Sequence, residues 1–125
     1  MNIDQFKHKI KQAIQVGTTL DNPGRGTSTV KALSDHGISY LRGRSVIYFS
    51  FQDIFDTFEH FNGGKVTSND LKSYRPIVFD SEANGHSCNC TFLFMLLKEM
   101  GVASEIGGHG VKGSPYFVGI FPAHD

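Results

Sequence analysis

The fold is decided by the stretch Phe92-Leu93-Phe94-Met95-Leu96-Leu97, which places six apolar residues in a row. Such a run leaves no polar face on a helix, and a helix without a polar face is buried on every side. We expect this helix to begin near Ser87 or Asn89 and to run to Met100, with Gly101 as the residue that ends it. The other elements must then pack around it.

Two further helices are predicted before this one, and both carry the same start signal. Ser50 with Asp53, and Thr67 with Asp70, have the spacing of a capping box, in which two residues satisfy each other's free backbone amides. Pro76 disfavours helical backbone at the residue before it, so we expect the second of these helices to be short.

Extended segments are predicted before and after the apolar helix. Residues 77–79 are predicted to form a brief extended segment, followed by a loop at 80–85. In the tail, residues 103–107 and 116–121 are predicted to form a hairpin around a glycine-rich loop at 108–113.

The first 49 residues predict a helix followed by a sheet. Asn2 is placed to cap a helix that has Gly17 just past its end, and the apolar side chains of this helix share one stripe. Turn-forming residues then occupy positions 18–26. From residue 27 the apolar period becomes two, which predicts an antiparallel meander. Its three strands are expected at 27–33, 38–41 and 46–49.

Together these elements predict a single α+β domain over residues 1–125, because a chain of 125 residues is too short for a second core of ordinary size. We expect the N-terminal helix and the three-stranded meander to make up residues 1–49. Three helices ending in a β-hairpin are expected to make up residues 50–125.

From Ser50 onward, the order helix, short helix, connection, helix and hairpin resembles the winged helix-turn-helix family. The resemblance covers residues 50–121 and implies DNA binding, with the third helix in a groove and the hairpin touching the backbone as a wing. On this resemblance, Ser87, Asn89 and Thr91 in the first turn of that helix would face the groove. The amides of the helix N-terminus also favour a phosphate.

Basic side chains outside that helix complete the DNA-binding prediction. Lys112 in the hairpin loop, with His109 nearby, is expected to neutralise a backbone phosphate. Arg42 and Arg44, displayed by the turn between the last two strands of the meander, are the next expected phosphate contacts. We therefore interpret the chain as a DNA-binding module, with a restriction, defence or mobile-element system as its hypothetical setting.

Two cysteines, Cys88 and Cys90, support a different hypothesis. A cysteine in the first turn of a helix has its thiolate stabilised by the helix N-terminus, which lowers its pKa. An Asn-Cys pair at the head of an apolar helix resembles the cysteine site of permuted papain-like peptidases and acyltransferases. That resemblance implies a cysteine-dependent hydrolase or acyltransferase in which His36 pairs with Cys90, whereas His109 with Cys88 follows the unpermuted order.

Metal binding is a third hypothesis for the same segment. His86, Cys88 and Cys90 could supply three zinc ligands, with His109 or His60 as the fourth. The spacing lacks the Cys-x₂₋₄-Cys pairs by which structural zinc sites are known, so we predict neither a metal nor another cofactor. The loop at 24–28 also precedes a strand, whereas a phosphate loop follows a strand and opens a helix.

Composition limits the class of protein. The 12 basic and 12 acidic residues give a net charge of zero, which argues against binding nucleic acid by bulk charge. The N-terminus lacks the continuous apolar region of a signal peptide, and the longest apolar run is too short to span a membrane. These features predict a cytoplasmic protein. A small protein-interaction inhibitor domain, with a protein as partner in place of DNA, also fits the zero charge and the compact size.

Overall fold

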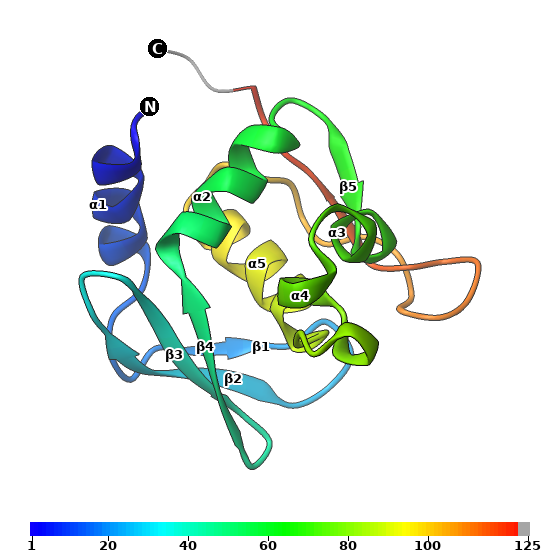
Figure 1. Cartoon of the computed structure of the whole chain (residues 1–125), viewed down its shortest axis with the longest axis horizontal. Helices are drawn as coiled ribbons and strands as arrows, with labels where there is room; N and C mark the ends of the chain where they lie inside the picture. The colour runs from blue at the N-terminus through cyan, green and yellow to red at the C-terminus, as the bar shows by residue number, and fades with distance from the viewer. Residues whose placement is uncertain (123–125) are drawn as a thin grey trace.

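The computed structural model describes residues 1–122 and shows an α+β fold built around one central helix. This helix, α5 (Cys88–Glu99), lies in the middle of the molecule, with α1 (Ile3–Ala13), α2 (Phe51–His60) and a sheet around it (Figure 1). Every residue of the 92–97 stretch is buried, with at most 4% of any residue exposed. The prediction of a helix buried on all sides is confirmed.

The sheet has four antiparallel strands in the order β1-β2-β3-β4. Three of them match the predicted meander, with small changes at their ends. The fourth, β1, lies within the region predicted to be a turn, so that prediction is wrong for residues 19–21. Three residues are too few to show an alternating pattern, and β1 exists because it pairs with β2. The strands are β1 (Thr19–Asp21), β2 (Thr27–Leu33), β3 (Gly37–Arg42) and β4 (Ser45–Ser50).

The helix starts follow the predicted caps. The Asn2 side chain accepts from the Gln5 amide in a reciprocal capping box, which begins α1. Thr67 and Asp70 form the same arrangement at the start of α3 (Ser68–Tyr74), which is short as expected. At the start of α2 only half of the predicted capping box forms, since Ser50 accepts from the amide of Asp53 while the Asp53 carboxylate pairs with Arg75.

The segment before the central helix differs from the prediction. Residues 77–79 are not extended, because Pro76 opens a short helix, α4 (Pro76–Phe79), and η1 (Ser81–Ala83) forms a further single turn. Proline has no amide to lose at the first helical position, and its fixed φ suits a helix start. The proline that stops α3 therefore also begins α4.

The tail pairs with a strand that was not predicted. β5 (Lys65–Thr67) and β6 (Phe117–Gly119) form a second, two-stranded antiparallel sheet. The predicted hairpin of residues 103–107 with 116–121 is reduced to isolated bridges, which join Ala103 to Ile120 and Gly107 to Phe117. The hairpin prediction was therefore right about which segments approach each other and wrong about the main partner of the last strand.

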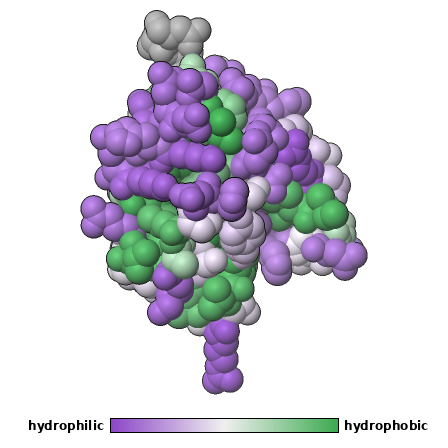
Figure 2. Space-filling view, turned by 60° about the vertical axis from the view of Figure 1, so that its left-hand side comes forward, coloured by the Kyte–Doolittle hydropathy of each residue, from purple (hydrophilic) through white to green (hydrophobic). Residues whose placement is uncertain are grey.

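The surface carries only scattered large apolar side chains. In the face shown in Figure 2, hydrophilic side chains dominate the upper part and apolar ones show mainly in the lower part. Among residues 1–122, no helix combines the length and the apolar character needed to cross a membrane. The largest exposed apolar fractions belong to Val16, Val46, Tyr48, Ile77, Val111 and Phe121.

Candidate functional site

The first turn of α5 is tied into the core by the side chain of Asn89. Its Oδ1 accepts a hydrogen bond of 2.8 Å from the Tyr40 hydroxyl, and its Nδ2 donates one of 3.0 Å to the Val78 carbonyl. Asn89 is only 2% exposed. The expectation that Asn89 contacts a DNA groove is therefore wrong, because both polar ends of its side chain are used inside the protein.

Replacing Asn89 with alanine is expected to destabilise the fold by about 2 kcal/mol, because it removes the acceptor of the buried Tyr40 hydroxyl and leaves the Val78 carbonyl with only the His86 amide as a donor. Urea unfolding followed by circular dichroism measures this loss. Tyr40→Phe removes the partner hydroxyl, so a double-mutant cycle should return a positive coupling energy between the two positions. Strictly additive losses would contradict the bond.

Cys90 is buried beside Asn89, and its environment opposes ionisation. Burial raises the pKa of the Cys90 thiol to about 12, and its Sγ lies 3.6 Å from the Phe79 carbonyl oxygen. The sequence predicted the reverse, a pKa lowered by the helix N-terminus. Because Cys90 itself is only 2% exposed, the loss of water outweighs the helix dipole and opposes an activated thiolate at Cys90.

The predicted histidine partners do not reach the cysteines. His36 is exposed and precedes β3 by one residue, about 13 Å along the chain from Tyr40, the β3 residue that bonds to Asn89. His109 is also exposed, and its Nδ1 lies 2.9 Å from the Ser114 hydroxyl. Among residues 1–122, no hydrogen bond joins His36 or His109 to either cysteine, so neither predicted histidine–cysteine pair is formed.

The zinc candidates are not assembled either. Within residues 1–122, no three side chains of the types that ligate metals come together. His86 is exposed, Cys88 is half-buried and Cys90 is buried, so the three candidates differ in environment as well. This segment therefore offers no metal centre.

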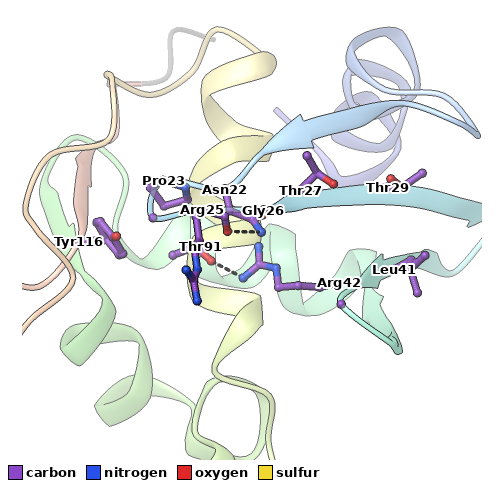
Figure 3. A pocket seen from close by; sticks show the side chains of 12 residues that line it. Asn22, Pro23, Arg25, Gly26, Thr27, Thr29, Leu41, Arg42, Thr91 and Tyr116 are labelled. Carbon is purple, nitrogen blue, oxygen red and sulfur yellow. Dashed lines mark hydrogen bonds between the residues drawn. The ribbon is translucent and has the colours of Figure 1, made fainter.

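A pocket of about 720 Å³ opens next to Thr91 in the first turn of α5. It lies where the loop between β1 and β2 meets the end of β3 (Figure 3). The Arg42 side chain extends from β3 towards Thr91 of α5, and the Arg25 side chain lines the pocket from the loop. The pocket is lined by Asn22, Pro23, Gly24, Arg25, Gly26, Thr27, Thr29, Leu41, Arg42, Gly43, Thr91 and Tyr116.

Arg42 is held in place by two hydroxyl groups. Its Nε donates to Ser28 Oγ at 2.8 Å and its Nη1 donates to Thr91 Oγ1 at 2.6 Å. Ser28 in turn donates to Asn22 Oδ1 at 2.7 Å. The remaining nitrogen, Nη2, is buried and has no hydrogen-bond partner among residues 1–122. The guanidinium is thus fixed by neutral groups, and one of its nitrogens makes no hydrogen bond within residues 1–122.

A second pocket of about 460 Å³ adjoins the first, because Thr91 and Tyr116 line both. It lies between α3, the first turn of α5 and the loop at residues 110–115. We call the two pockets together the basic groove. The second pocket is lined by Ser68, Asn69, Lys72, Ser87, Cys90, Thr91, Gly110, Val111, Lys112, Gly113, Pro115 and Tyr116.

The basic groove concentrates positive charge in a chain whose net charge is zero. Arg25, Arg42, Lys72 and Lys112 line it, and no aspartate or glutamate does. Within the part of the chain described, none of these four side chains makes an ion pair, and the ion pairs found involve Arg75 or Lys98 instead. Cations without an ion-pair partner and without a carboxylate in the same lining create a local positive potential.

Tyr116 joins the two halves of the groove, and two glycines let the neighbouring loops approach it. A Cβ atom at Gly110 would collide with the Tyr116 ring, and one at Gly24 would lie 3.1 Å from the Tyr116 hydroxyl. The loop that carries Lys112 and the loop that carries Arg25 are therefore both packed against one aromatic side chain.

The groove contains some of the predicted nucleic-acid contacts and not others. Arg42, Ser87, Thr91 and Lys112 line it, as the tertiary fold brings them together. Arg44 and His109 are exposed outside its lining.

Arg25, Lys72 and Tyr116 were not predicted as contacts. Two signals in the sequence could have drawn attention to the loop of Arg25, namely the glycines on either side of it and the excess of basic residues over residues 23–45. Comparison with known proteins found no matching family model, no matching curated protein and no matching solved structure.

Proposed function

We propose that this chain binds nucleic acid, with DNA as the first candidate, along the basic groove. The observation that carries the proposal is the set of four cations on two adjoining pockets, with no carboxylate in the lining and no ion pair to any of the four within residues 1–122. Phosphate neutralisation by lysine and arginine supplies most of the non-specific affinity for nucleic acid.

The neutral residues of the groove also suit a phosphate backbone. Hydroxyl and amide side chains make many of the sugar and phosphate contacts in known complexes, and Thr27, Ser68 and Asn69 line the two pockets. Tyr116, half-buried where the pockets meet, adds an aromatic side chain of the kind on which bases stack.

The winged-helix resemblance enters this proposal in a modified form. The order α2, α3, α5 and a loop carrying Lys112 supports a wing-like role for residues 108–113. Reading by the α5 face has no support, because Asn89 and the 92–97 stretch are buried. We propose instead that α5 supplies Ser87 and Thr91 to the wall of the groove, while the loops supply the charge.

Binding is expected to weaken steeply with salt. Four phosphate contacts to a single strand predict a slope of about −3 for the logarithm of the association constant against the logarithm of salt concentration. Fluorescence anisotropy with labelled single- and double-stranded oligonucleotides measures this slope. Lys72→Ala and Lys112→Ala should each weaken binding and reduce the magnitude of the slope by about 0.7 to 1.

Lys11→Ala is the matched control, because it removes the same charge from an exposed position on α1, outside the groove. It should leave both the affinity and the slope within error. Binding that does not depend on salt would contradict the proposal. A loss of affinity in Lys11→Ala equal to that in Lys72→Ala or Lys112→Ala would contradict it as well.

A further inference from the structure

We propose that the pocket beneath the β1–β2 loop is a discrete phosphate site, in which Arg42 and Arg25 hold a single phosphate group. The inference rests on the proposed function, because it assigns the ligand chemistry of one half of the same groove. The phosphate is either that of a nucleotide, as in a bound strand, or free inorganic phosphate, and the experiment below separates these sources.

Arg42 is prepared for an anion before any ligand arrives. Its Nε and Nη1 are bonded to the hydroxyls of Ser28 and Thr91, so the guanidinium is oriented without a counter-charge. Its Nη2 is buried and unpartnered within residues 1–122. An unsatisfied buried donor on a cation is costly, and a phosphate oxygen that reached Nη2 through a shift of the Arg42 side chain or of the loop would satisfy both the bond and the charge.

Arg25 brings a second guanidinium to the same pocket (Figure 3). It is exposed, and among the described residues its side chain makes neither a hydrogen bond nor an ion pair. Two cations that share a pocket without a carboxylate repel each other. An anion held by both would turn that repulsion into attraction, and Arg25 is free to move onto it.

The loop backbone supplies neutral donors as well. The loop is closed by a 3.0 Å hydrogen bond from the Asn22 amide to the Gly26 carbonyl, and Gly26 has a φ of +81°. Among the described residues, the amides of Gly24 and Arg25 donate to no backbone carbonyl. Free successive amides in a glycine turn form anion-binding concavities. Here the turn belongs to a hairpin, and the arginine comes from the neighbouring strand.

The other half of the groove has a different character. Within residues 1–122, the ammonium groups of Lys72 and Lys112 make no hydrogen bond that would orient them, and Lys112 is exposed in its loop. A lysine acts as a point charge, whereas a fixed guanidinium selects the geometry of a phosphate. We therefore assign the specific phosphate contact to the arginine half and a diffuse backbone contact to the lysine half.

The test is a titration of the ¹⁵N-labelled full chain followed by NMR. Inorganic phosphate and a nucleoside monophosphate should each give saturable shifts of the Gly24, Arg25 and Gly26 amides and of the Arg42 Nε–H. Sodium chloride at matched ionic strength, and the nucleoside without phosphate, should not. Tighter binding of the nucleotide than of phosphate supports a strand phosphate as the natural ligand, and equal binding supports free phosphate in the same site.

Variants separate the site from general charge. Arg42→Lys keeps the charge but loses the planar fork, and we expect phosphate affinity to fall about tenfold or more. Arg42 also bonds to Ser28 and Thr91, so Arg25→Ala is the second variant, because an exposed loop side chain without partners can be removed without unfolding the protein. It should weaken phosphate binding several-fold. Arg44→Ala is the matched control, outside the pocket lining, and should bind phosphate normally.

The inference is overturned if phosphate shifts match those of chloride, or if Arg25→Ala and Arg44→Ala bind phosphate equally. Oligonucleotide binding without saturable phosphate binding would also overturn it, and would leave the proposed function standing. Saturable phosphate binding without oligonucleotide binding would do the reverse.

Discussion

Phe92→Ala is expected to lower the free energy of unfolding by about 4 kcal/mol, a value typical of replacing a fully buried phenylalanine with alanine. Phe92 is 0% exposed on the central helix, and its ring stacks on Tyr40 with centroids 3.9 Å apart and planes 9° apart. The substitution removes the stacking and leaves a cavity between α5 and the sheet. A domain of this size is stable by about 5–15 kcal/mol, so this loss is a large fraction of the total.

Denaturant unfolding followed by circular dichroism measures this effect. Phe92→Leu is the graded comparison, because it retains most of the apolar volume and should cost much less. Val111→Ala, at a position that is 60% exposed, should change the stability by less than about 0.5 kcal/mol. A loss below about 1 kcal/mol in Phe92→Ala would show that the helix is not packed against the sheet in this way.

Alkylation of Cys90 in the folded protein is expected to be slower than in the unfolded chain by on the order of a thousandfold at pH 8, since only the thiolate reacts. Burial raises the pKa of the Cys90 thiol to about 12, against about 8.5 for a free cysteine. Mass spectrometry after timed treatment with iodoacetamide measures the rate in a Cys88→Ser background. Rapid labelling of the folded protein below pH 8 would instead revive the cysteine-enzyme hypothesis.

The same pKa shift predicts a pH dependence of stability. Because the folded pKa is raised, folding favours the neutral thiol, and this contribution is present in full below about pH 8.5, the pKa of the unfolded chain. It is lost as the pH rises towards the folded pKa of about 12. In Cys90→Ala, the decline in stability between these two pH values should be smaller than in the unaltered chain.

The helices and the meander were predictable because their signals are local. The caps at Asn2 and Thr67 need only residues three positions apart. The 92–97 stretch is apolar at every position, which by itself predicts that it is buried. β1 and β5 carry no such signal, since each has three residues and exists through pairing with a neighbouring or distant strand. β6 lies inside the strand predicted at 116–121, and only its pairing with β5 was not predicted. α4 was missed because Pro76 was read only as the end of one helix, although it also begins the next.

The candidate site was predictable only in part, for the same reason. Arg42, Thr91 and Lys112 were selected because they are polar or basic and lie on predicted turns or helix ends, and they line the groove. Lys72 and Tyr116 are unremarkable in the sequence and gain a role only where α3 and the tail pack beside α5. Asn89 was selected for a surface role that its burial contradicts.

The amino-acid sequence by itself determined that this protein builds an α+β fold around one helix without a polar face, because apolar periodicity and capping are written in neighbouring residues. Only the tertiary structure decided which side chains in the first turn of that helix are buried and which line the groove. Packing turned Asn89 and Cys90 inward to Tyr40, Val78 and Phe79, where water is excluded. It brought Arg25, Arg42, Lys72 and Lys112 from four separate segments to one groove, a meeting that no local pattern encodes.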